Sequence, residues 1–363
     1  MEPHQLTKAA ARRIAIQAQS LDEPRPTDVL EVVRHLTLVQ LNPTRHIAPS
    51  ADLLLWSRLG SSYSPDELTK LVDDGPLLEY KMTVRPSEYV SLIRADMADW
   101  PGRGPLREWQ YDNADWVRAN DAGRRDILER LRQDGPLAAR ELPDTCAVPW
   151  KSSGWTNDKN VLRLLEFMVS RGEVATVGRE GGERMWDLAE RVYPDDPIVP
   201  SDEAKRIRDE QRLRSLGIAR SKGPMCGVEP SDAGDAGEPA VVEGVRGQWR
   251  IDPALLDKPF TGRAALLSPF DRVISDRKRM LDLFEFDYQL EMFKPVAQRR
   301  WGYYALPILY GDRFVGKLDA TANRDAGTLD IHALHVDVAF TKRIRSAVDE
   351  EIDDLAAWLG LRA

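Results

Sequence analysis

A change of hydrophobic period within residues 121–188 is the feature that most constrains the fold of this chain. Apolar residues first recur at helical spacing, which predicts a helix around Ile127, a short second helix at 138–142 and a third helix that Asn157 can cap. After Gly172 the spacing alternates on either side of a glycine-containing turn, as in a β-hairpin. The order helix, short helix, helix and hairpin is typical of a winged helix. In that fold the third helix enters the DNA major groove and the hairpin contacts the flanking backbone.

The N-terminal segment is predicted to be helical, with one interruption. Two amphipathic helices are expected before residue 37, the second capped by Thr27. The short apolar stretch Leu38–Leu41 follows and ends at Asn42-Pro43, where proline disfavours a helix at the preceding residue. A third helix is expected at 53–59, and Ser64-Pro65-Asp66-Glu67 combines a capping box with a helix-starting proline. The chain must therefore turn at Asn42.

The C-terminal third is predicted to be rich in strands. Strands are expected at 264–267, 289–293, 302–309, 313–318 and 328–336, followed by an amphipathic helix at 344–359. The expected fold class is α+β, with tandem winged-helix units and a C-terminal small β-sheet or barrel domain. The expected domains are an N-terminal winged-helix unit (1–118), a middle winged helix (119–198), a third winged-helix-like unit (199–262) and a β-barrel-like domain with a closing helix (263–363).

Composition limits the class of protein. No window approaches the roughly 18 apolar residues of a membrane span, so we expect a cytoplasmic protein that does not contact a membrane. Cys146 and Cys226 have no paired spacing, and His332 and His335 would face opposite ways on a strand, so neither a disulfide nor a metal site is expected. The net charge of −8 argues against DNA binding, although basic residues cluster at 276–279 and 298–300.

Several sequence blocks together resemble one family. The run Leu266–Asp271, with Asp276–Arg279, Tyr288, Glu291, Pro295, Trp301–Tyr304 and Leu306-Pro307, is similar to the C-terminal signature of the YcaQ and AlkZ type DNA glycosylases. The similarity extends to 55–60, 153–155, 186–192 and 214–218. The resemblance implies tandem winged helices around a DNA-sized channel, a β-barrel, and monofunctional cleavage of the N-glycosidic bond of alkylated purines. It implies double-stranded DNA as partner and neither a metal nor an organic cofactor, and we expect a monomer.

The resemblance also assigns a catalytic motif. Family members carry Gln, an apolar residue and then Gln or Asp near the end of the second helix, and this chain reads Gln40-Leu41-Asn42. Gln40 is therefore the expected catalytic residue that positions water and sugar, with Asn42 as its catalytic partner. Asn42 lacks the carboxylate that could stabilise a cation at C1′ or deprotonate water. The alternative interpretation is that Gln40 and Asn42 only cap and turn a junction between helix and loop.

Two further departures weaken the expectation of crosslink unhooking. Residues 79–86 lack the histidine of a Trp-Ala-His-Glu-Ala type motif, and Ser275 stands where the family usually has Trp. These changes favour a distinct branch of the family.

Basic and polar residues near the predicted DNA-reading elements form the candidate DNA-binding set. It comprises Arg45, His46, Lys159, Asn160, Arg163, Arg179, Arg184, Arg277, Lys278, Arg279, Arg299 and Arg300. The alternative for the first five is a solvated loop or helix face, and the alternative for the C-terminal five is ion pairing with Asp271, Asp276 or Glu291. Trp155 and the aromatic residues Trp301, Tyr303, Tyr304 and Phe314 are expected in the core.

Two hypotheses for the function follow. The first is a DNA glycosylase acting on cationic N-alkylpurines, with interstrand crosslinks among its candidate substrates. The second is a non-catalytic winged-helix DNA-binding protein, regulatory or architectural, and the absent carboxylate and the acidic net charge favour it.

Overall fold

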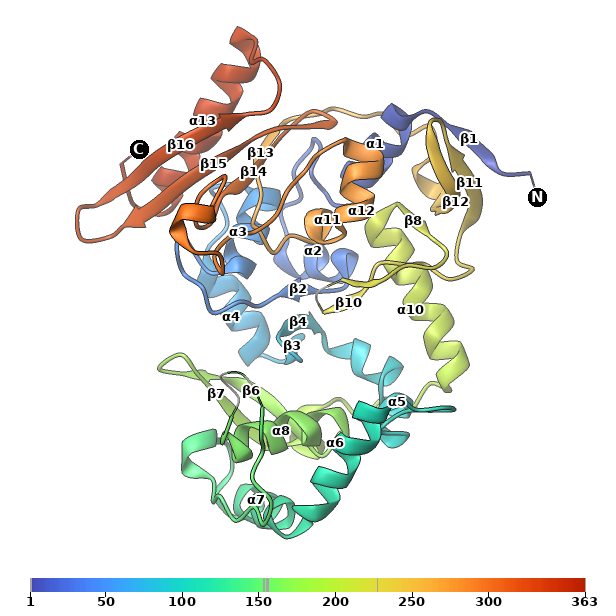
Figure 1. Ribbon diagram of the computed structural model, residues 1–363, viewed down its shortest axis with the longest axis vertical. Coiled ribbons are helices and arrows are strands. Elements are labelled where there is room, and N and C mark those ends of the chain that lie inside the picture. The colour runs from blue at the N-terminus through green and yellow to red at the C-terminus, as the bar shows by residue number, and fades with distance from the viewer. Residues whose placement is uncertain (1, 153, 155–156, 227, 363) are drawn as a thin grey trace. The chain divides into compact units, whose positions relative to one another are not determined.

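The computed structural model describes residues 2–152, 154, 157–226 and 228–362 (Figure 1). Its contacts divide the chain into two compact units, which are described separately. The first unit combines Met1–Leu68 with Asp209–Ala363, and the second is Thr69–Arg208. The chain passes between them within α4 (Pro65–Asp73) and α10 (Ser201–Leu216). These borders differ from the four domains expected from sequence, because both ends of the chain belong to one unit.

The N-terminal part of the first unit has the predicted amphipathic helices. Its elements are β1 (His4–Leu6), α1 (Lys8–Gln17), α2 (Val29–Leu36), β2 (Val39–Gln40) and α3 (Ser50–Leu59). The Thr7 hydroxyl accepts a hydrogen bond from the amide of Ala10 and caps α1. Asp28, rather than Thr27, caps α2 by accepting from the amide of Glu31.

A four-stranded sheet with the order β1-β11-β12-β8 packs against α1 in the first unit. It contains β8 (Ile218–Arg220), β11 (Glu238–Val242) and β12 (Val245–Ile251); β1 runs parallel to β11, and the other pairs are antiparallel. The core of the unit includes Ile14, Trp249 and Leu267. The segment before β11 contains a short antiparallel ladder of β9 (Met225–Cys226) and β10 (Glu229–Pro230).

The C-terminal strands form a second four-stranded sheet, with helix α13 (Lys342–Trp358) packed on β13 and β14 (Figure 1). The strands are β13 (Ala264–Leu266), β14 (Leu306–Tyr310), β15 (Arg313–Asn323) and β16 (Thr328–Val336), each antiparallel to its neighbour. Among the described residues no pairing joins β13 to β16, so the sheet is open and does not close into a barrel.

The predicted strand at 289–293 is wrong. The carboxylate of Glu291 is buried and accepts hydrogen bonds from the backbone amides of Arg300 (2.6 Å) and Trp301 (2.8 Å). The chain is thereby held in a loop that returns on itself, and backbone groups that would pair in a ladder bind a side chain instead. This region contains α11 (Arg272–Ser275), α12 (Arg277–Arg279), a π-helical turn (Met280–Phe284) and a 3₁₀ turn (Val296–Gln298).

The second unit follows the predicted order of helix, short helix, helix and hairpin. Its helices are α5 (Arg94–Ala98), α6 (Glu108–Ala119), α7 (Asp121–Asp134), α8 (Asn160–Ser170) and α9 (Ala189–Val192), with 3₁₀ turns at Ser87–Leu92 and Ala139–Glu141. Its strands β3 (Leu77–Tyr80), β4 (Thr83–Pro86), β5 (Leu137–Ala138), β6 (Val174–Glu180) and β7 (Glu183–Leu188) lie in the order β4-β3-β6-β7-β5. Helix α8 begins at Asn160, so Asn157 is not its cap.

None of the helices in the described part of the chain has the length and apolar composition needed to cross a bilayer.

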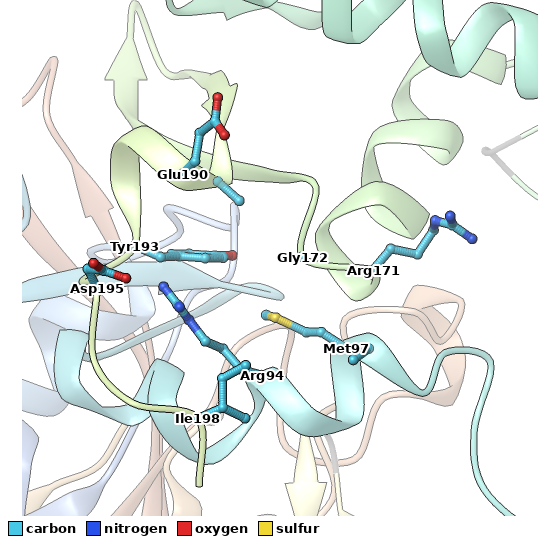
Figure 2. A pocket seen from close by; sticks show the side chains of 10 residues that line it. Arg94, Met97, Arg171, Gly172, Glu190, Tyr193, Asp195 and Ile198 are labelled. Carbon is cyan, nitrogen blue, oxygen red and sulfur yellow. The ribbon is translucent and has the colours of Figure 1, made fainter.

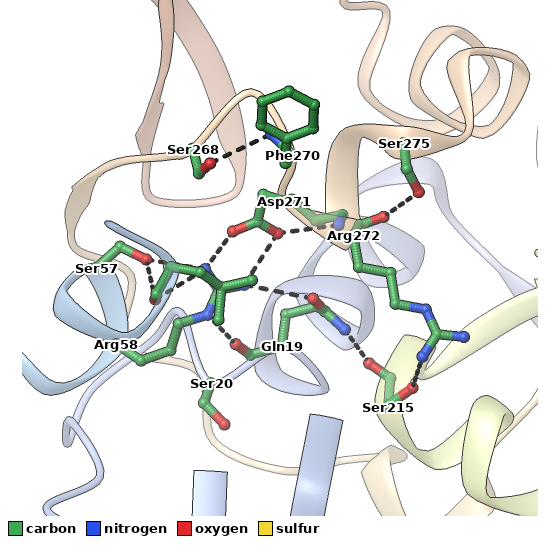
Figure 3. Close-up of polar contacts among 12 residues, drawn as sticks. Gln19, Ser20, Ser57, Arg58, Ser215, Ser268, Phe270, Asp271, Arg272 and Ser275 are labelled. Atoms are coloured by element: carbon green, nitrogen blue, oxygen red, sulfur yellow. Dashed lines mark hydrogen bonds and ion pairs between the residues drawn. The ribbon is translucent and has the colours of Figure 1, made fainter. Parts of the chain in front are cut away.

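A fully buried ion pair joins distant segments of the first unit (Figure 3). The guanidinium of Arg58 on α3 donates two hydrogen bonds to the carboxylate of Asp271, and both side chains have no exposed surface. Arg58 also donates to the backbone oxygen and the side-chain oxygen of Gln19, which follows α1. Asp271 in turn caps α11 through the amide of Val273. The pair thus connects the end of α1, α3 and the segment after β13.

Replacing Asp271 by Asn should destabilise the protein by about 3 to 5 kcal/mol, because Arg58 would remain buried without its counter-charge. The free energy of unfolding in urea measures this loss. The control Asp349→Asn, in an ion pair with Arg345 where both side chains are 54% exposed, should cost less than about 0.5 kcal/mol. Equal losses in the two variants would contradict the prediction.

Candidate functional site

Gln40 is the last residue of β2, and Asn42 lies in the loop that leads from β2 to α3. Ser50, the first residue of α3, holds this loop: its hydroxyl donates to the backbone oxygen of Gln40 (2.8 Å) and accepts from the backbone amide of Asn42 (2.9 Å). Ser50 is buried, so water competes little for these bonds. The backbone of the motif is therefore fixed by one hydroxyl group.

The two motif side chains differ in their hydrogen bonding. The side-chain oxygen of Asn42 accepts a hydrogen bond from the backbone amide of Thr44 (3.0 Å), which is the Asx turn expected for Asn before Pro. The side-chain amide of Gln40 forms no hydrogen bond within the described residues, and the residue is half-buried. The side-chain oxygen of Asn42 is thus bonded within the loop, whereas the side-chain amide of Gln40 has no such bond within the described residues.

The loop between the motif and α3 is anchored on strand β15. The backbone oxygen of His46 accepts from the amide of Ala322 (3.2 Å), and the backbone oxygen of Ile47 accepts from the Arg324 guanidinium (3.1 Å). The ring nitrogen Nε2 of His46 forms a hydrogen bond with the Thr321 hydroxyl (3.0 Å), which also bonds to His332 (2.9 Å). These hydrogen bonds consequently attach the motif loop to the C-terminal sheet.

Two carboxyl groups that sequence reasoning did not single out interact with this loop. Asp52 on α3 accepts a hydrogen bond from the Tyr63 hydroxyl (2.7 Å), and burial raises the pKa of Asp52 while the charge of Arg45 lowers it. Asp319 on β15 acts on His46: burial lowers the pKa of His46, and the negative charge of Asp319 opposes that shift. Asp52 lies on the next helix, and Asp319 lies on a strand far from the motif in sequence. No spacing rule could therefore have identified them.

Asp319 and His46 line a cavity of about 660 Å³, which we call the Asp319 groove. Its lining residues are His46, Val296, Arg299, Gly302, Tyr303, Asp319, Thr321 and His332. The ring of Tyr303 lies 4.8 Å from that of His46, between centroids, and the Arg299 guanidinium lies 5.0 Å from the Tyr303 ring centre. Tyr303 is half-buried, so the expectation of a core position is wrong for Tyr303, whereas Trp301, Tyr304 and Phe314 are buried.

The predicted DNA-binding residues of the first unit divide by exposure. Arg45 and Arg277 are exposed and have no ion pair within the described residues. Lys278 and Arg300 are also exposed, in ion pairs with Asp282 and Asp287 respectively. His46 and Arg299 are half-buried at the Asp319 groove.

Arg279 does not fit the predicted DNA-binding set, because the residue is only 3% exposed. Its guanidinium donates to the backbone oxygens of Ile218 (3.1 Å) and Leu216 (2.8 Å), and burial lowers the pKa of Arg279 to about 10. A side chain held in this way cannot reach a phosphate. Arg279 is a structural residue that holds the end of α10 and β8.

In the second unit most predicted DNA-binding residues are occupied by internal contacts. Arg179 donates to the carboxylate of Glu79 through Nε and Nη2, and Arg184 lies 3.9 Å from the same carboxylate. The side-chain oxygen of Asn160 accepts from the backbone amide of Trp150. Lys159 is exposed. Ser153 and Trp155 lie outside the described residues.

Arg163 and Arg184 line one aromatic cavity of the second unit. The guanidinium of Arg163 stacks over the ring of Phe167, 4.3 Å from its centre, and pairs with Glu166 (2.9 Å). The cavity has a volume of about 440 Å³ and is also lined by Trp100, Trp109 and Trp186. Tertiary structure thus brings together two arginines that the sequence assigned to a helix and a hairpin.

Figure 2 shows another cavity of the second unit, of about 540 Å³. The hydroxyl of Tyr193 points into it and has no hydrogen-bond partner in the described part of the chain. Arg94 lies beside it and donates to the backbone oxygen of Pro194 (2.5 Å). None of the residues predicted to act on DNA lines this cavity.

Comparisons with known proteins identify similar chains. The family model described as "DNA glycosylase AlkZ-like" matches residues 33–358. Among solved structures, the Streptomyces sahachiroi DNA glycosylase AlkZ is similar in fold, with a TM-score of 0.67 and 18% sequence identity. The similarity covers 99% of this chain and 98% of that one.

The interaction between Asp319 and His46 can be tested by titration. The pKa of His46 should lie below the usual 6.5, because burial disfavours the charged ring. Asp319→Asn should lower the pKa of His46 further, since it removes the negative charge that favours the protonated ring. NMR titration of the histidine side chains measures both values. Asp325→Asn, an exposed acid on the turn after β15, is the matched control and should leave the pKa of His46 unchanged. A pKa of His46 that rises in Asp319→Asn would refute the interaction.

Proposed function

The chain belongs to the AlkZ-like DNA glycosylase family, and from that premise we propose that it hydrolyses the N-glycosidic bond of cationic N-alkylpurines in double-stranded DNA. The product would be an abasic site and the free base. Interstrand crosslinks joined through such purines are further candidate substrates. The proposed enzyme is a cytoplasmic monomer that uses neither a metal nor an organic cofactor.

The observation that carries the proposal is the state of Gln40. Its backbone is fixed by Ser50, while its side-chain amide is half-buried and without a hydrogen bond in the described part of the chain. A polar side chain that forms no internal hydrogen bond can bond to a ligand without breaking a contact within the protein. Gln40 is also the residue that matches the first position of the family's motif.

The chemistry needs little acid catalysis. An N7-alkylated purine is positively charged and departs as a neutral base, so the developing charge lies on the sugar at C1′. The side-chain oxygen of Gln40 can accept a hydrogen bond from the attacking water and orient it toward C1′. The carbonyl dipole can also stabilise positive charge on the sugar. Gln40 is the proposed catalytic residue.

Asn42 has a narrower role in this proposal. Its oxygen is already bonded to the amide of Thr44, which leaves its NH₂ group as the free end. An NH₂ group donates hydrogen bonds and cannot stabilise a cation. We therefore infer that Asn42 shapes the loop and donates to the sugar or to the water held by Gln40.

Exposed cations are the proposed phosphate contacts. Arg45 follows the motif directly, and Arg277, Lys278 and Arg300 are exposed on the first unit, as Lys159 is on the second. Exposed lysine and arginine side chains supply the sequence-independent part of DNA affinity. The order of elements in 121–188 supports the interpretation of that segment as a winged helix.

One observation favours the alternative, a DNA-binding protein without catalytic activity. The Asx turn of Asn42 is what a purely structural motif would form, and no carboxylate occupies the third motif position. In that case the chain would bind DNA and release no base.

A duplex carrying a single N7-methylguanine distinguishes the two functions. The wild-type protein should produce alkali-labile breaks above the spontaneous rate, and Gln40→Ala should lower the rate by roughly 10²-fold, because one preorganised group is lost. The rate of strand breakage under single-turnover conditions is the measurement.

Gln5→Ala, an exposed glutamine on β1, is the matched control and should retain the wild-type rate. Asn42→Asp should keep the turn, because a carboxylate can still accept from Thr44, and should retain activity. DNA binding with no breaks in the wild type would establish the non-catalytic function instead.

Arg45→Gln should weaken binding to all DNA sequences to the same extent, because it removes a phosphate contact. The slope of log affinity against log salt concentration should become shallower by about one unit. Fluorescence anisotropy at several salt concentrations measures this slope. Arg343→Gln, an exposed arginine on α13, should leave it unchanged, and an unchanged slope in Arg45→Gln would remove Arg45 from the interface.

A further inference from the structure

The carboxylate of Asp319 is an acid without a counter-charge in the described part of the chain. It forms neither an ion pair nor a hydrogen bond there, although it is half-buried. It lies against the backbone of Gly302: a Cβ at Gly302 would stand 2.1 Å from the carboxyl carbon of Asp319. Gly302 also has a φ of +110°, which other residues rarely adopt. A glycine is therefore required for the chain to pass this carboxylate.

The charges around the Asp319 groove are arranged as a dipole. Asp319 is the negative end, whereas Arg299 is positive and lies over the ring of Tyr303. Burial lowers the pKa of His46, which favours the neutral ring. The groove thus offers one negative group, one positive group and an aromatic ring within a space of about 660 Å³.

An N7-alkylated purine nucleotide has the complementary arrangement of charges. Its base carries a positive charge that an unalkylated purine lacks, and its phosphate is negative. A groove lined only by cations would bind any nucleotide phosphate, whereas an unpaired carboxylate repels phosphate and favours a cationic base. The positive base is also attracted to an aromatic face such as that of Tyr303.

One residue of the motif loop, His46, lines the Asp319 groove. His46 lies four residues after Asn42 and contributes its ring to the groove, where it bonds to Thr321 on β15. The backbone of the same loop is held to β15 at Ala322. A nucleotide in the groove would therefore lie beside the loop that carries Gln40.

We propose that the Asp319 groove binds the alkylated nucleotide itself, with Asp319 as the counter-charge of the cationic base and Arg299 as the contact for its phosphate. This inference rests on the proposed function and adds to it the residue that discriminates damaged from undamaged purines. It assigns the negative charge that Asn42 lacks to a residue of the C-terminal sheet. Asp319 is here a specificity-determining residue that contacts the base.

Binding of mononucleotides to the full chain tests the inference without requiring hydrolysis. The probes are 7-methyl-GMP, whose base is cationic, and GMP, whose base is neutral, with affinities measured by NMR titration. The wild type should prefer 7-methyl-GMP by roughly five-fold, the upper range for a solvent-accessible charge pair. Asp319→Asn should abolish the preference. Arg299→Gln should lower the affinity for both nucleotides by the same factor.

Asp325→Asn removes the same charge outside the groove and should keep the full preference. Unchanged thermal unfolding of Asp319→Asn shows that its effect is local. Equal affinity of the wild type for the two nucleotides, or a preference that survives in Asp319→Asn, overturns the inference. Those results leave the proposed hydrolysis intact when the wild type still breaks the N7-methylguanine duplex. The opposite result is a wild type that prefers 7-methyl-GMP through Asp319 but does not break the duplex. That result supports nucleotide binding in the groove and contradicts the proposed hydrolysis.

Discussion

The buried pair of Arg58 and Asp271 is the interaction on which the first unit depends. Two charges without exposed surface are tolerated only because each is paired and further hydrogen-bonded, here to Gln19, to Ser57 and to the amide of Val273. The pair therefore fixes α3 relative to the segment that follows β13. Ser50, which holds the motif loop, is the first residue of α3. The same ion pair therefore also fixes the position of Ser50.

The motif loop is consequently held at its two ends rather than by bonds among its own residues. Ser50 holds the backbone of Gln40 and Asn42. Thr321 and Ala322 on β15, together with Arg324 in the turn after that strand, hold the residues before α3. Between these anchors Gln40 keeps a free amide group and Arg45 stays exposed. The C-terminal sheet thus takes part in the candidate site, and Asp319, which sequence reasoning did not consider, is its most unusual member.

Several candidate residues show how far sequence reasoning reaches. The sequence places Arg277, Lys278 and Arg279 together in the candidate DNA-binding set, but the three residues differ in exposure. Arg277 and Lys278 are exposed, whereas Arg279 is buried and donates to backbone oxygens. On one short helix, adjacent positions point in different directions, so a cluster in sequence is not a cluster in space. Tyr303 was assigned to the core with its neighbours, yet it lines a groove because Gly302 and Glu291 bend the chain there.

Local sequence determined the elements whose stability is local: the helical periods of α1, α2, α7 and α13, the hairpin after Gly172, and the turn at Asn42. The resemblance to the family's motif made Gln40 the expected catalytic residue. Only the tertiary structure decided the open C-terminal sheet, the loop held by Glu291, the burial of Arg279 and the meeting of His46 with Asp319. The physical reason is that the burial and pairing of a charge depend on which other segments pack against it. Arg279, for example, bonds to the backbone of Ile218, 61 residues away in the chain, and no local pattern records such a contact.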